Sequence, residues 1–219
     1  MLEPIVVDVV SDVVCPWCYI GKRRLEAAIA QLRESDPDLP FAVRWHPFQL
    51  NPDLPAEGID RKAYVEAKFG GPERAQQIYE RVTAAGRTVG IPFAFDAIAR
   101  QPNTLDAHRL VAWAQSRREG DADALVEGLF RANFIEGRYV GDLTELASIA
   151  LAAGYDPDDA RAFLVSDEMR DAVAQADIRA REMGIGGVPF FIFDGKTAVS
   201  GAQEPATIVE AIRRARATA

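Results

Sequence analysis

Two cysteines, Cys15 and Cys18, are the residues of this chain best suited to chemistry. They are its only cysteines and lie three positions apart. Residues three apart in the first turn of a helix share one face, so the two sulfur atoms can form a disulfide and break it again. An apolar, strand-like run precedes the pair and a helical pattern follows it. In this context the spacing of the two cysteines is a more specific signal of a redox pair than the spacing alone. The sequence therefore predicts a redox-active cysteine pair.

The position of the pair at a helix N-terminus gives its members different roles. A thiolate at Cys15 would face the unsatisfied N–H groups and the positive end of the helix dipole, which favour the charged form. We expect Cys15 to be the nucleophile and the more buried Cys18 to be the resolving thiol that attacks a mixed disulfide. Pro16 suits the first helical position, where its missing N–H costs nothing. Trp17 is expected to lie partly exposed and to offer an apolar contact to a substrate.

Three alternative roles for the pair stay open. A structural disulfide that closes so small a ring would contribute only about 2 kcal/mol, and a chain of this length folds without one. A zinc site would need both histidines, His46 and His108, whose spacing is unlike that of a zinc finger. The third alternative is two unrelated buried thiols. A redox pair needs no metal or organic cofactor, because the redox equivalents reside in its own sulfur atoms, and we expect none.

The residues around the pair predict a β-α-β unit. Residues 5–10 form a nearly continuous apolar run, which is typical of a strand covered on both faces. Apolar residues recur at helical spacing over 19–32, and residues 41–45 alternate between apolar and polar as a second strand. Asp8 interrupts the first strand, and we expect it to face the surface or to form a salt bridge; the alternative is a buried carboxylate near Cys18 that acts as its proton acceptor, with a raised pKa. The cysteine pair thus joins the first strand to the helix.

The remainder of the chain predicts a long helical segment followed by a β-β-α unit. Helical periodicity runs from about residue 60 to 183, with no convincing strand. Strands are predicted at 188–193 and 197–200, with a hairpin turn between them at Asp194-Gly195. A final amphipathic helix covers 203–216, with cationic residues in its last turn. The order of elements is therefore β-α-β, helical insert, β-β-α.

The composition excludes several classes of partner. The 219 residues include 25 Lys and Arg against 33 Asp and Glu, a formal net charge of −8. This charge opposes broad contact with nucleic acid or anionic lipid. No stretch approaches the ~20 apolar residues of a membrane-spanning helix, and the first residues lack the basic region of a signal peptide. We expect a cytoplasmic protein with no nucleic-acid or membrane partner.

Three motifs lie at corresponding places in a known family of proteins. They are Asp-Val-Val-Cys-Pro-Trp-Cys at 12–18, Asn-Thr-Leu-Asp-Ala-His at 103–108 and Gly-Gly-Val-Pro-Phe at 186–190. Together they resemble the DsbA-like thioredoxin-fold oxidoreductases, and most closely the FrnE-like branch. The resemblance covers essentially the whole chain. It extends to the 2-hydroxychromene-2-carboxylate isomerases and kappa-class glutathione transferases, but these place a serine where this sequence has Cys15.

The resemblance implies an α/β fold class, a thioredoxin fold (β-α-β … β-β-α) with a large inserted all-helical domain. The thioredoxin-like domain would comprise residues 1–55 and 184–219, and the helical domain residues 56–183. In that family the proline at the position of Pro189 is cis and faces the active-site disulfide, and the backbone of the residue before it, here Val188, pairs with an extended substrate peptide. Without the resemblance, the Val188–Pro189 bond would be predicted to be trans, because only about 5–6% of X–Pro bonds in folded proteins are cis.

His108 belongs to a predicted helix at 104–118 that, by the resemblance, lines the cleft, and Asn103 directly precedes this helix. We expect both to face Cys15, where a neutral His108 would accept or relay the proton of the thiol and a charged one would favour the thiolate. Without the resemblance, His108 is equally a histidine that packs between helices and touches no part of the site. We also expect the helical insert, and not the thioredoxin core, to set the choice of substrate.

The sequence therefore predicts a thiol-disulfide oxidoreductase that uses Cys15-Pro16-Trp17-Cys18 to oxidise, reduce or isomerise protein disulfides. Its partners would be protein or peptide substrates, a redox partner that recycles the pair, and glutathione as a further candidate. Two other functions stay open. One is a glutathione-dependent isomerase or transferase of the same fold, and the other is a redox-sensing or chaperone-like binding protein without catalysis.

Overall fold

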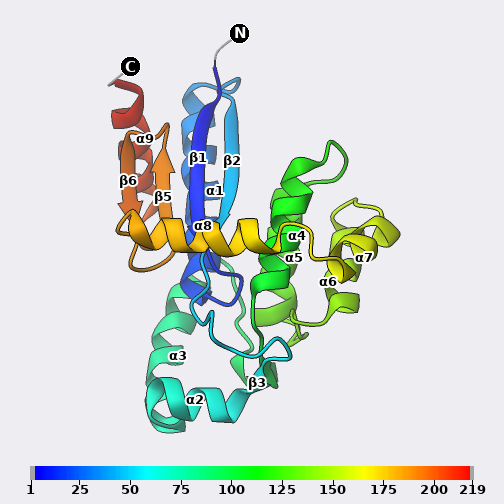
Figure 1. Ribbon diagram of the computed structural model, residues 1–219. Coiled ribbons are helices and arrows are strands. Elements are labelled where there is room, and N and C mark those ends of the chain that lie inside the picture. Colours follow the sequence, from blue (N-terminus) through cyan, green and yellow to red (C-terminus); the bar gives the residue numbers. More distant parts are fainter. Residues whose placement is uncertain (1–2, 218–219) are drawn as a thin grey trace.

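The centre of the molecule is a four-stranded mixed sheet with strand order β2-β1-β5-β6 (Figure 1). A computed structural model describes residues 3–217. β1 (Ile5–Ser11) runs parallel to β2 (Phe41–Pro47) and antiparallel to β5 (Phe190–Phe193). β6 (Thr197–Ser200) completes the sheet by pairing antiparallel with β5. The predicted β-α-β and β-β-α units thus share one sheet, with β1 in its interior.

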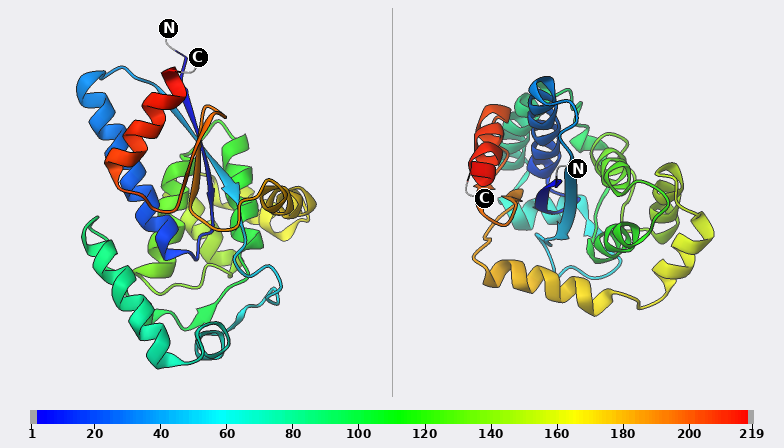
Figure 2. Two further views of the ribbon diagram at one scale, coloured as in Figure 1. Left: turned by 90° about the vertical axis from the view of Figure 1, so that its left-hand side faces the viewer. Right: turned by 90° about the horizontal axis from the view of Figure 1, so that it is seen from above.

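Helices cover both faces of this sheet, as Figures 1 and 2 show. α1 (Pro16–Ser35) and α9 (Pro205–Ala217) pack on one face, and α8 (Arg170–Glu182) crosses the other. Val7 and Val9 of β1 belong to the main core, together with residues of α1 and α9. Val10 belongs to a second cluster with Phe48 and with Ala180 of α8. Burial on both sides explains why β1 is a nearly continuous apolar run.

The segment between β2 and β5 is mainly helical, as predicted. Its helices are α2 (Arg61–Phe69), α3 (Pro72–Arg87), α4 (Leu105–Ser116), α5 (Ala122–Phe134), α6 (Leu143–Ala152), α7 (Pro157–Val165) and α8, with a short 3-10 turn at Phe95–Ala97. The expectation of no strand in this segment is wrong. β3 (Ile59–Asp60) and β4 (Arg100–Gln101) form a separate two-stranded sheet. Strands of two residues are too short to show the alternation from which a strand is predicted.

Aspartate caps explain where several of these helices begin. In four of them the residue before the helix is an aspartate whose carboxylate accepts hydrogen bonds from two of the first backbone N–H groups. These caps are Asp60, Asp121, Asp142 and Asp156. Such caps satisfy donors that have no partner within the helix and each contributes typically about 1 kcal/mol. The helical segment is therefore well specified by its local sequence.

α5 attaches the helical segment to the helix that carries the cysteines. Lys22 of α1 is buried and forms ion pairs with Asp123 at 2.9 Å and Glu127 at 3.5 Å. Burial alone would lower the pKa of Lys22, but Asp123 and Glu26 raise it on balance, so the ammonium stays charged. The ring of Tyr19 also stacks on Phe130 of α5, with 4.9 Å between centroids. These contacts fix α1 against the insert.

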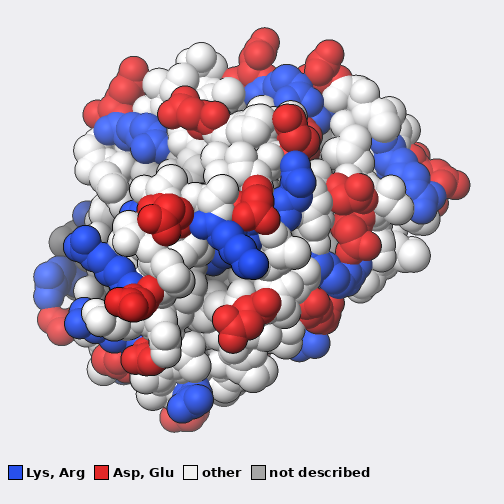
Figure 3. Space-filling view, turned by 90° about the horizontal axis from the view of Figure 1, so that it is seen from below, with Lys and Arg blue, Asp and Glu red and all other residues white. Residues whose placement is uncertain are grey.

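The surface carries interspersed charges of both signs. Figure 3 shows this for the end of the molecule that carries α2 and α3, where the described basic side chains form no continuous patch. Within residues 3–217, no helix is both long and apolar enough to cross a membrane.

Candidate active site

The cysteine pair lies at the start of α1, just after the end of β1. Cys15 is the N-cap of α1 and has an extended backbone, and Pro16 is the first helical residue, as predicted. The Cys15 carbonyl accepts hydrogen bonds from the backbone N–H groups of Cys18 at 3.0 Å and Tyr19 at 3.3 Å. Both cysteines are free thiols and both are buried, Cys18 more deeply. Trp17, between them, is partly exposed, as expected.

The surroundings of Cys18 favour its protonated form. Burial raises the pKa of the Cys18 thiol well above its usual range, and the neighbouring Cys15 raises it further through a hydrogen bond and through charge. The Ser11 side chain and the backbone of Asp12 oppose this effect but do not cancel it. Cys18 therefore stays a neutral thiol behind Cys15, which is the state suited to a resolving thiol.

The loop before β5 approaches Cys15 from a distant part of the chain. The peptide bond between Val188 and Pro189 is cis. The Sγ atom of Cys15 lies 3.6 Å from the carbonyl oxygen of Val188. Pro189 packs on α1 at Gly21, where a Cβ atom would lie only 2.8 Å from the proline Cγ. The glycine therefore permits the close approach of this loop to the helix that carries the cysteines.

Asn103 lies in the loop before α4, and its side-chain amide forms hydrogen bonds with nearby residues. Its Oδ1 accepts hydrogen bonds from the Leu105 N–H at 2.9 Å and from Gln49 Nε2 at 3.1 Å. Its Nδ2 donates to the carbonyl of Leu54 at 2.6 Å. Asn103 thus ties α4 to the segment that follows β2, and its role as a substrate contact stays a prediction.

His108 reaches the cysteine loop through Asp12, a residue that the sequence interpretation did not single out. Asp12 is fully buried. Its Oδ1 lies 3.3 Å from His108 Nε2, and its Oδ2 accepts a hydrogen bond from the Leu50 N–H at 2.7 Å. The Asp12 carbonyl accepts a hydrogen bond from the Cys15 N–H at 3.0 Å. Only its place in the motif at 12–18 could have indicated Asp12, because buried and exposed aspartates look alike in a sequence.

Tyr64 of α2 is a second residue near the site that sequence reasoning missed. Burial raises the pKa of Tyr64, while the side chain of Asn51 and the charge of Arg61 oppose the rise. The charge of the Asp12 carboxylate raises the pKa of Tyr64 further, so Tyr64 lies within electrostatic reach of the cysteine loop. Nothing in the local sequence distinguishes this tyrosine from other half-buried residues of an amphipathic helix.

The two histidines considered as zinc ligands have separate partners. His46 Nε2 lies 2.7 Å from Asp8 Oδ1, which is within the distance of the salt bridge expected for Asp8. His108 instead faces Asp12. Across the described residues 3–217, no group of three or more His, Cys, Asp or Glu side chains is arranged to hold a metal ion. The arrangement therefore contradicts a Cys2His2 zinc site.

A family model described as a DSBA-like thioredoxin domain matches residues 6–213. The chain belongs to this family. The predicted fold class, a thioredoxin fold with large helical additions, is thereby confirmed. Proteins of the DsbA-like family are generally oxidoreductases or isomerases.

Three similar proteins show how far the similarity extends. The crystal structure of a probable DsbA oxidoreductase from Streptomyces coelicolor is 31% identical, with a TM-score of 0.85 over 98% of this chain and 91% of that one. The Bacillus subtilis protein YwbO is 27% identical over 197 residues, 90% of each chain. The cytosolic disulfide reductase DsbM from Pseudomonas aeruginosa, solved with GSH, shares the fold at 17% identity, with a TM-score of 0.61 over 97% of this chain and 96% of that one.

Proposed function

We propose that this protein is a thiol-disulfide oxidoreductase that acts on the disulfides and thiols of proteins or peptides. The observation that carries the proposal is the approach of Val188 to Cys15, with 3.6 Å between the Val188 carbonyl oxygen and the sulfur atom. It brings a free thiol at a helix N-terminus together with the backbone that, in the related oxidoreductases, pairs with substrate. Membership of the DsbA-like family supports the same class of reaction.

The reaction consists of two exchanges of sulfur partners. A Cys15 thiolate attacks one sulfur of a substrate disulfide, so that a Cys15–substrate bond forms and the second substrate sulfur leaves as a thiolate. Cys18 then loses its proton and attacks Cys15, which forms the Cys15–Cys18 disulfide and releases the first substrate sulfur. The reverse sequence oxidises a substrate dithiol and leaves Cys15 and Cys18 reduced. The reduction potential of the pair decides which direction prevails.

The loop and the exposed indole would hold the substrate. An extended peptide would pair with the backbone of Val188 next to Pro189, in the manner of strand addition, and would contact Trp17 beside Pro16. Asn103 and His108 remain candidates for contacts from the insert. The insert also offers a cavity of about 1170 Å³ between α2, α3 and residues 93–99.

Glutathione is a candidate co-reactant, and a cytoplasmic location would suit it. The support is the DsbM relative, a cytosolic disulfide reductase solved with GSH. In this role glutathione would reduce the Cys15–Cys18 disulfide through a glutathione–Cys15 mixed disulfide. Another protein thiol could recycle the pair in the same way.

Trapping the mixed disulfide tests the proposed function. Cys18→Ala is expected to accumulate a one-to-one covalent adduct with a disulfide-bonded peptide, since the resolving thiol is lost, while the wild type turns the same peptide over. Mass spectrometry after digestion should locate the peptide on Cys15. The double variant Cys15→Ala/Cys18→Ala is the control and should form no adduct.

A wild type that neither forms an adduct nor exchanges disulfides would overturn the proposal. If that protein is nevertheless retained on immobilised glutathione, the glutathione-dependent isomerase or transferase becomes the better assignment. If it binds a partner according to the redox state of the pair, without turnover, the redox-sensing alternative is favoured.

Gly21 provides a prediction about the geometry of the loop. Gly21→Ala is expected to slow disulfide exchange about tenfold, an increase of about 1.4 kcal/mol in the barrier. The added Cβ would meet Pro189 Cγ at 2.8 Å and Phe191 Cζ at 3.1 Å, and so push the loop away from Cys15. Exchange kinetics and circular dichroism measure activity and folding. Ala30→Ser, on the exposed side of α1, is the control, and equal rates for both variants would contradict the prediction.

A further inference from the structure

Asp12 is the first residue of the turn that ends at Cys15. Its carbonyl oxygen accepts a hydrogen bond from the Cys15 N–H at 3.0 Å, which closes this turn over residues 12–15. The side chain of Asp12 is fully buried, and a buried carboxylate is costly unless other groups bind it. The groups that bind the carboxylate therefore also decide where the turn, and with it Cys15, is held.

The Asp12 carboxylate accepts hydrogen bonds from three parts of the chain. Oδ2 accepts from the Leu50 N–H at 2.7 Å, in the segment after β2. Oδ1 lies 3.5 Å from the Val14 N–H within the turn and 3.3 Å from Nε2 of His108 on α4. Backbone N–H groups at both oxygens favour the ionised form of a carboxylate. Asp12 thus joins the turn to the sheet and to the helical insert.

The contact with Asp12 fixes the role of His108 Nε2. An ionised carboxylate accepts hydrogen bonds and donates none, so the hydrogen between the two residues must lie on Nε2. His108 is 5% exposed, and no hydrogen bond joins it to Cys15 among the described residues 3–217. Its Nε2 atom is therefore a donor to Asp12, which differs from the proton acceptor for Cys15 that the sequence suggested.

A second contact ties the same part of the insert to the neighbourhood of the turn. Asn103, five residues before His108, accepts a hydrogen bond from Gln49 Nε2 at 3.1 Å. Gln49 precedes Leu50, whose N–H binds Asp12. The two polar ends of the motif at 103–108 thus hold the turn directly and through the segment after β2.

We propose that Asp12 and His108 are positioning residues: His108 donates a hydrogen bond to the buried Asp12 carboxylate, and this bond holds the turn so that Cys15 lies next to the Val188 carbonyl. The proposal rests on the proposed function. It means that α4 of the insert acts on disulfide exchange through the turn and without contact to the substrate. Reactive groups are held in a productive geometry by such supporting hydrogen bonds.

Two variants of His108 separate positioning from proton transfer. His108→Leu removes the donor and is expected to slow exchange with a peptide disulfide about tenfold, since a misplacement of about 1 Å can cost up to about 10²-fold in rate. His108→Gln keeps an N–H donor near the place of Nε2 but cannot take up a proton, and it should recover most of the wild-type rate. Thermal unfolding checks that both variants are folded.

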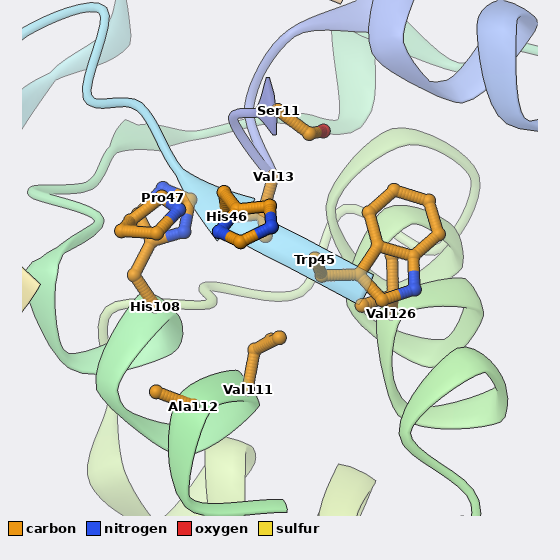
Figure 4. A pocket seen from close by; sticks show the side chains of 9 residues that line it. All are labelled: Ser11, Val13, Trp45, His46, Pro47, His108, Val111, Ala112 and Val126. Carbon is orange, nitrogen blue, oxygen red and sulfur yellow. The ribbon is translucent and has the colours of Figure 1, made fainter. Parts of the chain in front are cut away.

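The other histidine of the chain provides a matched control. His46 pairs with Asp8 of β1 at 2.7 Å, and both histidines line a cavity of about 20 Å³ together with Val13 of the turn (Figure 4). Asp8 lies in β1 and not in the turn, so His46→Leu should leave the rate of exchange unchanged.

Nitrogen-15 NMR of the wild type tests the donor independently of activity. At a pH where the imidazole is neutral, long-range proton–nitrogen correlations should show the hydrogen of His108 on Nε2, with the signals assigned by their loss in His108→Gln. Hydrogen on Nδ1 instead would overturn the proposal. This measurement stands even if the wild type forms no mixed disulfide, which is the outcome that defeats the proposed function.

Asp12→Asn completes the test by changing the other partner. Asparagine has the same shape, but its NH₂ group would face either the Leu50 N–H or His108, so exchange should slow in the same sense as in His108→Leu. Because the two residues act through one bond, the double variant Asp12→Asn/His108→Leu should be no slower than the slower single variant. Additive losses, a wild-type rate in His108→Leu, or a His108→Gln rate as low as that of His108→Leu would each overturn the proposal.

Discussion

Cys15→Ser is expected to lower the rate of disulfide exchange by about 10³-fold or more, because the nucleophile is removed. A thiolate at this position benefits from the N–H groups and the dipole at the start of α1, whereas a serine hydroxyl stays protonated near neutral pH. The folded structure should persist, since Cys15 is the N-cap of α1 and serine is a preferred N-cap residue. The measurement is the rate of insulin or peptide disulfide reduction, together with thermal unfolding.

The matched variant is Cys18→Ala, which removes the other thiol of the same motif. It should lose steady-state turnover but keep the rate of the first step, because Cys15 remains. The two variants therefore differ in which half of the reaction survives. If Cys15→Ser retained more than about a tenth of the wild-type rate, or if Cys18→Ala lost the first step, the roles assigned to the two cysteines would be wrong.

Elements with strong local signals were predictable from the sequence. The doubly covered strand β1 is a nearly continuous apolar run, and Pro16 marks the start of α1. The last helix of the insert shows where local signals fail. The predicted helical periodicity runs through Met169, but this residue adopts a left-handed backbone with φ of 61°, and α8 begins at Arg170. A positive φ at a methionine has no sequence signature.

The residues of the candidate site were also predictable only where the signal is local in the sequence. Cys15 and Cys18 are recognisable because both lie in one helical turn. The approach of Val188 joins residues 173 positions apart, and it was expected only from the resemblance to DsbA-like proteins. Asp12 and Tyr64 were missed because their proximity to the cysteines depends on how β2, α2 and α4 pack around the loop. Residue type alone carries no information on that packing.

Arg109→Met is expected to lower the free energy of unfolding by about 3–5 kcal/mol, the cost of breaking a buried charge network. Arg109 of α4 is fully buried and pairs with Asp106 at 2.7 Å. Its guanidinium also donates to backbone carbonyls where α7 ends and the chain turns toward α8, namely those of Phe163, Leu164, Ser166 and Glu168. Methionine would fill similar space but would donate to none of these carbonyls, and an acceptor that stays buried without a donor costs about 1–3 kcal/mol before relaxation.

Arg170→Met is the control for this prediction, because Arg170 pairs with the same Asp106 but is 40% exposed. An exposed pair contributes about 0–1 kcal/mol, so urea unfolding should show a small change for Arg170 and a large one for Arg109. Equal changes would contradict a special role for the buried guanidinium.

Arg109 directly follows His108 on α4, so its bonds to the α7–α8 connection also set where α4 holds His108 against Asp12. Arg109→Met should therefore slow disulfide exchange even at temperatures where the variant remains folded, whereas Arg170→Met should not.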